Sequence, residues 1–230
     1  LRDLGSVAQV ATCDSSDLVD VAALAMLAQP LVGVLHAAGA GDKGLLIELA
    51  AHKMHWMYAP KAFGASYLHN TTQTAPLDAS ILWSSVGSGL GNVGQGNYAA
   101  GNACLDALAL SRRTHGVSAR CLQWPLVGGA GMGAAIFASI AELKLTVTGM
   151  AGISLEQYAS CLAPQLSAGG GVGVSVQMAH RSSLSELLQD LADPQQPRFS
   201  ELRVATHKSP SVKAAAGVAA PCVGSELAET

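Results

Sequence analysis

Residues 83–102 read WSSVGSGLGNVGQGNYAAGN, and the fold prediction starts from this passage of strand end, glycine-rich run and helix start. Ser85 lies directly before the glycines, Tyr98 follows thirteen residues later, and Asn102 is four residues beyond Tyr98. Lys61 lies twenty-four residues before Ser85. Because residues four apart on a helix share one face, Tyr98 and Asn102 are predicted to point the same way.

These residue types suit one kind of chemistry. A phenol is a weak acid with a pKa of about 10. A nearby cation such as Lys61 can lower that pKa, and a hydroxyl such as that of Ser85 can share a substrate oxygen. A serine at a strand end is often only a turn former, and a tyrosine at a helix start is often a surface anchor. The joint spacing of Lys61, Ser85, Tyr98 and Asn102 instead favours a site that protonates a carbonyl oxygen while a hydride arrives at carbon.

The segments on either side alternate between strand and helix patterns. Strands are predicted at 7–13, 31–38, 79–86, 119–124 and 171–178; helices are predicted at 17–28, 44–69 with an interruption around Ala59-Pro60, 98–114, from the 128–133 loop to about 143, and at 154–167. The apolar run 31–38 is typical of a strand covered on both faces. This alternation predicts an α/β fold with an open parallel sheet flanked by helices. Ligands bind such sheets beyond the carboxyl ends of the strands, where Ser85 lies.

Composition excludes several classes of function. Half of the 230 residues are apolar and 13% are charged, which is enough apolar material for a packed core. The formal net charge of −3 and the few aromatic residues give no reason to expect nucleic acid as a partner. The apolar runs are too short to span a membrane. His52 and His55 stand without a cysteine or carboxylate cluster, so no metal site is expected.

The cysteines and the N-terminus bear on compartment. The five cysteines are odd in number, scattered and without a CxxC pair, so they are predicted to be reduced thiols of a cytoplasmic protein. The chain begins Leu-Arg-Asp-Leu, which is neither an initiator methionine nor a signal peptide. We therefore expect this chain to be a piece of a longer polypeptide.

Five stretches carry a resemblance to a known family: HAAG at 36–39, APKAFGA at 59–65, the opening passage at 83–102, NACLDALA at 102–109 and LQW at 122–124. They resemble the ketoreductase domain of modular polyketide synthases, a branch of the short-chain dehydrogenase/reductase family. The resemblance covers roughly residues 1–180. Most short-chain dehydrogenases carry lysine four residues after the tyrosine. Here Asn102 stands there and Lys61 comes from the earlier helix, which is the mark of polyketide and animal fatty-acid synthase ketoreductases.

The resemblance implies a Rossmann-like three-layer α/β/α sandwich and a role for each residue. Tyr98 would donate the proton to the nascent alkoxide, and Ser85 would hydrogen-bond the ketone oxygen. Lys61 would stabilise the tyrosinate and bind the nicotinamide ribose, while Asn102 would support a water chain that reprotonates the site. The implied reaction is NADPH-dependent reduction of a β-ketoacyl thioester, carried on an acyl carrier protein, to the β-hydroxyacyl thioester within a polyketide or fatty-acid synthase.

The resemblance also implies cofactor contacts. Ala38 and Gly39, at the end of the second predicted strand, would lie close to NADPH together with Lys61 and Tyr98. An aspartate at the position of Asp14 contacts the adenine in the family. Asp14 could equally be a helix cap, and both interpretations stay open here.

One part of the family's pattern is missing. The first βαβ unit, which carries the pyrophosphate loop and the residue that selects NADPH, has no counterpart in this chain. We therefore expect an exposed edge of the sheet where these strands are missing. We also expect the isolated chain to bind NADPH weakly or not at all and to be inactive. Residues 1–180 are assigned to the ketoreductase domain, and 181–230 to a largely flexible linker toward a following synthase domain.

Two alternatives stay open on the sequence. One is a non-catalytic ketoreductase-like domain that stabilises a synthase by packing, and the other is a free-standing short-chain dehydrogenase that acts on a small ketone. The intact set of four polar residues disfavours the first, and the linker-like tail disfavours the second.

Overall fold

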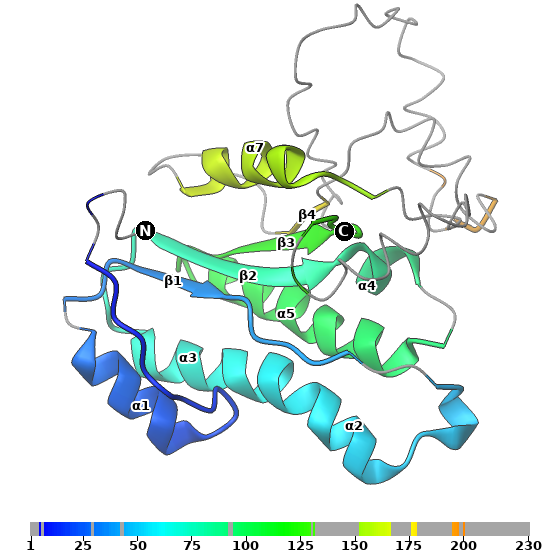
Figure 1. Cartoon of the computed structure of the whole chain (residues 1–230), viewed down its shortest axis with the longest axis horizontal. Helices are drawn as coiled ribbons and strands as arrows, with labels where there is room; N and C mark the ends of the chain where they lie inside the picture. The colour runs from blue at the N-terminus through cyan, green and yellow to red at the C-terminus, as the bar shows by residue number, and fades with distance from the viewer. Residues whose placement is uncertain are drawn as a thin grey trace, which may run out of the picture.

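The sheet and its order define the architecture. A computed structural model describes residues 5, 7–28, 30–41, 44–91, 94–129, 131, 152–166, 176–178, 195–197 and 200. Its strands are β1 (Gly33–His36), β2 (Ala79–Ser85), β3 (Arg120–Trp124) and β4 (Val176–Met178). They form one parallel sheet in the order β1-β2-β3-β4, with Leu35 beside Ile81 and Leu82 beside Cys121. The predicted open parallel sheet is confirmed (Figure 1).

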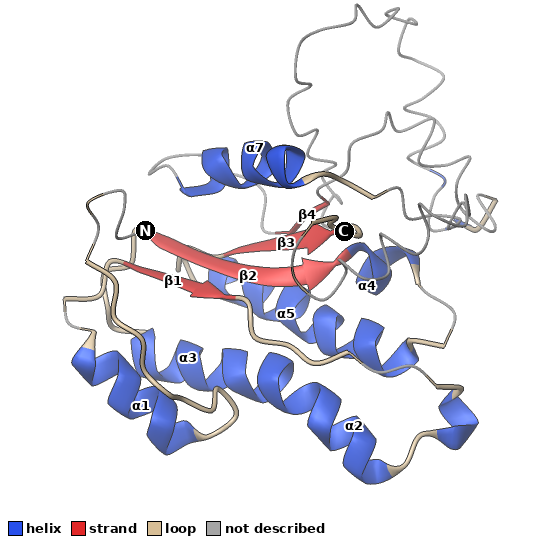
Figure 2. Cartoon of the chain, in the orientation of Figure 1, coloured by secondary structure: helices blue, strands red, loops and turns tan. Residues whose placement is uncertain are grey.

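Helices cover both faces of this sheet. In chain order the described helices are α1 (Leu18–Leu27), the short 3-10 turn η2 (Leu46–Glu48), α2 (Ala51–Tyr58), the π-helical turn η3 (Ala59–Phe63), α3 (Gly64–Thr72), α4 (Val86–Leu90), α5 (Gly96–Thr114) and α7 (Leu155–Leu166). Helix α7 lies on one side of the sheet, while α5 and the α2–α3 rod lie on the other, with α1 beside α3 (Figure 2). The three-layer α/β/α arrangement is therefore confirmed.

Two apolar clusters fill the spaces between the layers. One lies between the sheet and the helices α3 and α5, and it contains Ala65, Leu82, Leu105, Ala109, Ala119 and Cys121. The other lies under α7 and contains Ile81, Leu122, Trp124 and Ile153, with Trp83, Val127, Tyr158, Cys161 and Leu162 against it. Neighbouring strand residues such as Ile81 and Leu82 fall in different clusters because successive side chains of a strand point to opposite faces. Strand β2 is thus buried on both sides, which fixes the position of its carboxyl end.

Local signals set several helix ends where the sequence predicts them. Helix α1 begins after Asp17, whose carboxylate accepts hydrogen bonds from the backbone N–H groups of Val19 and Asp20. Helix α5 ends at Thr114, and Gly116 follows with a φ of +74°, a conformation that favours glycine. The interruption predicted at Ala59-Pro60 is confirmed and takes the form of the π-helical turn η3.

Two predictions about the N-terminal half are wrong. Residues 7–13 form no strand, because none of the described strands lies beside them to complete a ladder; Val7 and Val10 are more than 90% exposed. The strand predicted at 31–38 is only four residues long and is not covered on both faces, since Leu35 is 55% exposed. Leu35 lies next to Ile81 on the α7 face, but the cluster under α7 extends over β2 and β3 and leaves β1 at the edge. Among the described strands, β1 is thus at an edge of the sheet.

Other predictions meet the limits of the described residues. The strand at 171–178 is seen as β4 over its last three residues. The helical stretch up to about residue 143 and nearly all of the 181–230 linker lie outside the described residues. Cys13, Cys104 and Cys121 are free thiols, whereas Cys161 is in a disulfide, so the prediction of reduced cysteines is wrong at that position. Among the helices described, none is long and apolar enough to cross a membrane.

Candidate active site

Lys61 is the centre of the candidate site. It lies in the π-helical turn η3 and is only 3% exposed, which is rare for a lysine. Its Nζ donates a hydrogen bond of 3.1 Å to the carbonyl of Trp83, near the end of β2. Burial lowers the pKa of Lys61 to about 8, while the nearby Cys121 and Asp106 act in the opposite direction. The ammonium is therefore largely charged near neutral pH.

Tyr98 and Asn102 lie next to this lysine on α5. The Lys61 Nζ is 5.6 Å from the centre of the Tyr98 ring, within the range of a cation–π contact. The Asn102 side chain is fully buried and donates its amide to the Tyr98 carbonyl at 2.8 Å. Its Oδ1 has no hydrogen-bond partner among the described residues. The structure thus brings Lys61, Tyr98 and Asn102 together, although Lys61 is far from the other two in sequence.

Ser85 ends the same strand to which Lys61 is bound. Its Oγ accepts a hydrogen bond of 3.1 Å from the backbone N–H of Gly87 and caps the short helix α4. Because the hydroxyl acts there as an acceptor, its own hydrogen is not used in that bond. Sequence patterns predicted a glycine-rich loop at this place, whereas residues 86–90 form α4.

Two cofactor-binding residues are predicted directly after β1, and one of them, Gly39, lies very close to Lys61. A Cβ atom added to Gly39 would lie 2.9 Å from Cε of Lys61, which is closer than real Cβ contacts come. The chain after β1 therefore passes directly over the lysine, and a side chain at this position would require the end of the Lys61 side chain to move. Ala38 immediately precedes it and is half-buried.

Asp14 lies in a turn rather than at the helix start. Its Oδ1 accepts hydrogen bonds from the backbone N–H and the hydroxyl of Ser16, and these bonds lower the pKa of Asp14. The cap of α1 is Asp17, so the helix-cap interpretation of Asp14 is wrong. The neighbouring Ser15 packs against Gly64 at the start of α3, where a Cβ on Gly64 would meet the Ser15 carbonyl at 2.9 Å.

His36 is a buried group that sequence patterns did not single out. It ends β1 and is 3% exposed. Burial and then the charge of Lys61 lower its pKa to about 4, so its imidazole is neutral at physiological pH. Lys61 therefore has a neutral neighbour on this side.

A set of hydrogen-bonded side chains behind the end of β2 also escapes prediction from the sequence; we call it the Asp106 network. It consists of Ser84, Ser88, Asp106, Cys121 and Gln123. Sequence patterns place Asp106 only in the middle of a helix, but it follows Tyr98 and Asn102 at the same four-residue interval. That interval is the signal that could have found it, because it places all three on one face of α5.

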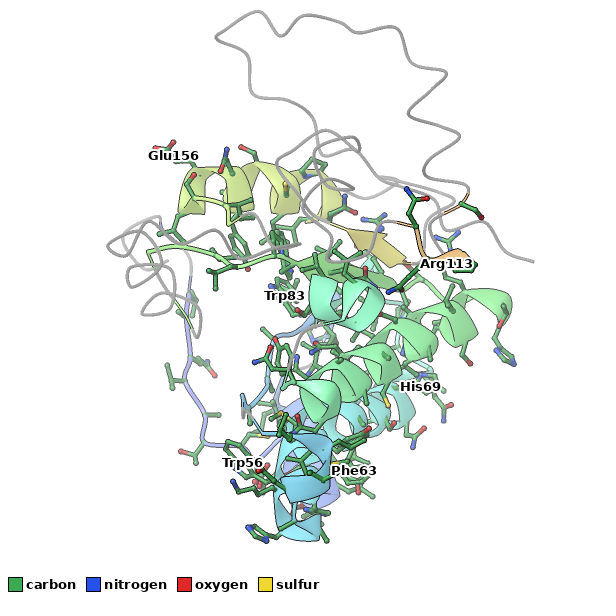
Figure 3. The ribbon with its side chains drawn as sticks, turned by 90° about the vertical axis from the view of Figure 1, so that its right-hand side faces the viewer. Trp56, Phe63, His69, Trp83, Arg113 and Glu156 are labelled. Carbon is green, nitrogen blue, oxygen red and sulfur yellow. The ribbon has the colours of Figure 1, made fainter. Side chains whose placement is uncertain are left out.

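Two aromatic residues near the site are held by α7. The indole N–H of Trp83 donates a hydrogen bond of 2.8 Å to the hydroxyl of Tyr158, and the Tyr158 ring lies 4.3 Å from that of Trp124. Figure 3 shows Trp83 at the sheet, whereas Glu156 points outward from α7. In the described part of the chain, no three His, Cys, Asp or Glu side chains are grouped so that they could hold a metal ion.

Comparisons with known proteins agree on one family. The KR domain family matches residues 1–129. The Spectinabilin polyketide synthase system protein NorB of Streptomyces orinoci is 35% identical over 213 residues, which cover 86% of this chain and 10% of that protein. Erythronolide synthase EryA2 of Saccharopolyspora erythraea is 36% identical over 179 residues, or 75% of this chain and 5% of that protein.

Solved structures show the same likeness. The first ketoreductase of the tylosin PKS has a TM-score of 0.66 and 30% identity, covering 82% of this chain and 40% of that one. A structure of A-type ketoreductases from modular polyketide synthase has a TM-score of 0.73 and 27% identity, covering 89% and 43%. This chain therefore spans less than half the length of these relatives.

Proposed function

Because this chain belongs to the KR domain family, we propose that it is the ketoreductase part of a polyketide synthase and reduces a β-ketoacyl thioester to the β-hydroxyacyl thioester. The observation that carries this proposal is the buried Lys61 ammonium 5.6 Å from the centre of the Tyr98 ring, at the carboxyl end of β2. A buried cation beside the ring can stabilise the negative charge that is left on the tyrosine when it gives its proton to the substrate.

Each residue has a defined task in this reaction. Ser85 donates its unused hydroxyl hydrogen to the ketone oxygen, and Tyr98 donates the proton that this oxygen takes up. Lys61 stabilises the resulting tyrosinate. Asn102 keeps its orphaned Oδ1 for a water molecule that returns the proton to the site. When bound, NADPH supplies the hydride.

The residues present fit a nicotinamide cofactor. An ammonium carries three N–H donors, and Lys61 uses one of them on the Trp83 carbonyl, so two remain for ribose hydroxyls. Gly39 lets the backbone approach closely, and Ala38 and Tyr98 flank the same place. Asp14, whose Oδ2 is not engaged by Ser16, is proposed to contact the adenine. The preference for NADPH over NADH rests on the family resemblance.

The wider assignments follow from the same membership. We propose that the substrate is held on an acyl carrier protein and that neighbouring synthase domains are partners. Residues 1–180 form the ketoreductase domain in this proposal, 181–230 form the linker, and the synthase works in the cytoplasm.

Absorbance of NADPH tests the proposal. An N-terminally extended protein with a first βαβ unit is given a β-ketoacyl thioester surrogate, and wild type is compared with Tyr98→Phe. We expect the variant to lose roughly 100-fold or more in kcat, since it lacks the proton donor. Equal turnover in the variant would contradict the role of Tyr98. A folded, NADPH-binding wild type that reduces neither free nor carrier-bound substrates would favour the non-catalytic domain.

A further inference from the structure

The Asp106 network lies outside the residues that the proposed reaction uses. Asp106 is on α5, one turn after Asn102. Its carboxylate accepts hydrogen bonds from Ser88 at 2.7 Å, from the side-chain amide of Gln123 at 2.8 Å and from the thiol of Cys121 at 3.0 Å. These donors come from α4 and β3, so one carboxylate joins three elements around the end of β2.

Ser88 connects this carboxylate to the backbone of Ser85. Its Oγ lies 2.8 Å from the Ser85 carbonyl and also accepts a hydrogen bond of 3.0 Å from Gln123. A hydroxyl has one hydrogen, so Ser88 donates either to Asp106 or to Ser85 at any moment. When Ser88 donates to Ser85, it links the end of β2 to Gln123, which donates to both Ser88 and Asp106.

The last three residues of β2 are thus each tied to a different partner. The Trp83 carbonyl accepts from Lys61, the Ser84 hydroxyl donates to the Asn102 carbonyl at 3.4 Å, and the Ser85 carbonyl faces Ser88. Because Ser85 is the last residue of β2, the position of its hydroxyl depends on these anchors. Two of the three anchors come from α5 or from a side chain bound to α5.

The network also contains a carboxylate that acts on Lys61. The charged or titratable groups around the lysine are His36 from β1, Tyr98 and Asp106 from α5, and Cys121 from β3. The His36 imidazole is neutral. Burial, together with Asp106, raises the pKa of Cys121 well above 9, so its thiol is neutral as well. Asp106 is the carboxylate of this set, and it acts on Lys61 in the direction that favours the charged ammonium.

We propose that Asp106 is a positioning residue of the active site, which holds Ser85 in place through Ser88 and balances the buried charge of Lys61. The effect of this positioning on catalysis rests on the proposed ketoreductase function, whereas the hydrogen bonds of Asp106 do not depend on that function.

Two variants separate the two roles proposed for Asp106, which are the contact to Ser85 through Ser88 and the balance of the Lys61 charge. Asp106→Asn keeps the shape: its Oδ1 can accept from Ser88 and Gln123 while its amide nitrogen faces the Cys121 sulfur, so mainly the charge is lost. Ser88→Ala keeps the charge and removes the bridge to Ser85. Asp78→Asn is the matched control, because it removes an exposed carboxylate just before the opposite end of β2.

The first readout needs no turnover. Acetic anhydride acetylates only the neutral amine, so the rate of Lys61 acetylation against pH, followed by mass spectrometry, reports the ionisation of Lys61. We expect Asp106→Asn to lower the midpoint by about half a pH unit or more, because an anion near a lysine favours its charged form. Ser88→Ala and Asp78→Asn should leave the midpoint where it is in the wild type.

The second readout is the kcat of the extended protein with the thioester surrogate. We expect Ser88→Ala to lower kcat about tenfold or more, because a displaced hydroxyl loses its orientation. Asp106→Asn should shift the alkaline limb of the kcat profile downward together with the Lys61 midpoint. Asp78→Asn should match the wild type in both respects.

The outcomes distinguish this inference from the proposed function. If Asp106→Asn is folded and turns over with an unchanged Lys61 midpoint and alkaline limb, Asp106 does not balance the lysine, although the ketoreductase reaction stands. If Ser88→Ala keeps wild-type kcat, the bridge to Ser85 is refuted. If the wild type reduces no thioester, the proposed function fails, and the Lys61 midpoint still tests the charge. Should Asp106→Asn not fold, Asp106→Ser serves as the second charge-removing variant.

Discussion

At the scale of single residues, the chemistry of the site depends on a lysine that is buried yet charged. Lys61 is 3% exposed, and burial lowers its pKa to about 8, well below its ordinary value of 10.5. A lysine whose pKa is lowered by folding loses its charge at lower pH than a free lysine. Lys61 is thus charged below about pH 8 and neutral above it.

This shift predicts the pH dependence of the reaction. If the charged lysine is needed to stabilise the tyrosinate, kcat falls as pH rises through about 8. The measurement is the kcat of the extended protein between pH 6 and pH 10, in steps of about half a pH unit. Lys61→Arg is the control: its guanidinium stays charged throughout, so we expect low activity with no alkaline limb of this origin. The same limb in Lys61→Arg would assign it to another group.

Gly39 gives a second residue-scale prediction. Gly39→Ala places a Cβ at 2.9 Å from Cε of Lys61, and we expect the lysine side chain to shift away from the Tyr98 ring. Activity should then fall at least tenfold while the protein stays folded, because a small misplacement of a catalytic group is costly. Thermal unfolding and kcat check this together.

The matched control for that change is Gly96→Ala. A Cβ at Gly96 meets nothing within 4 Å, and its φ is not positive, so activity and unfolding should be unaffected. A Gly39→Ala variant as active as Gly96→Ala would show that the close approach to Lys61 does not matter.

At the scale of elements, the π-helical turn η3 decides where Lys61 points. It joins α2 to α3 without a break in the rod, and it contains Pro60, which cannot donate a helical backbone hydrogen bond. Such turns inside helices are rare and occur often at functional sites. The wider turn changes the rotation of the rod at this point, and Ala59 and Lys61 both become buried.

The contact between α7 and the sheet makes an element-scale prediction about stability. Tyr158→Phe removes the acceptor of the Trp83 indole N–H and leaves that donor without its 2.8 Å partner. We expect the free energy of unfolding to fall by about 1 kcal/mol, the usual cost of losing one such hydrogen bond. Urea unfolding measures it, with tryptophan fluorescence as the signal.

Tyr67→Phe provides the control for that measurement, since Tyr67 is half-buried on α3, away from α7. It should change stability by less than about 0.5 kcal/mol. Equal losses in both variants would mean that the Trp83–Tyr158 bond contributes nothing of its own.

At the scale of the whole molecule, the outer edge of the sheet is the main feature. Among the described strands, β1 pairs on one side only, with β2. Leu35 on this strand and Val32 before it are more than half exposed. Exposed strand edges with apolar side chains favour association with further strands.

This edge predicts how the chain behaves by itself. We expect the 230-residue chain to bind NADPH at least tenfold more weakly than the N-terminally extended protein, because the family resemblance implies that a first βαβ unit would supply a pyrophosphate loop and pair with β1. Quenching of tryptophan fluorescence on titration with NADPH measures both affinities. Equal affinities would show that the described residues hold the cofactor without the extension.

The sequence by itself determined the local features. The four-residue interval places Tyr98 and Asn102 on one helix face, Asp17 and Gly116 mark helix ends, and the alternation of strands and helices gives a parallel sheet. Each of these depends on residues close together in the chain, so local periodicity and capping are enough to predict them.

Only the tertiary structure decided which distant residues meet. Lys61 reaches Tyr98 because the π-helical turn packs against α5, Tyr158 reaches Trp83 across 75 residues, and Asp106 gathers side chains from α4 and β3. Leu35 is exposed although its sequence reads as buried, because burial depends on which elements cover a strand. Such contacts and their pKa shifts arise from long-range packing, which no local pattern records.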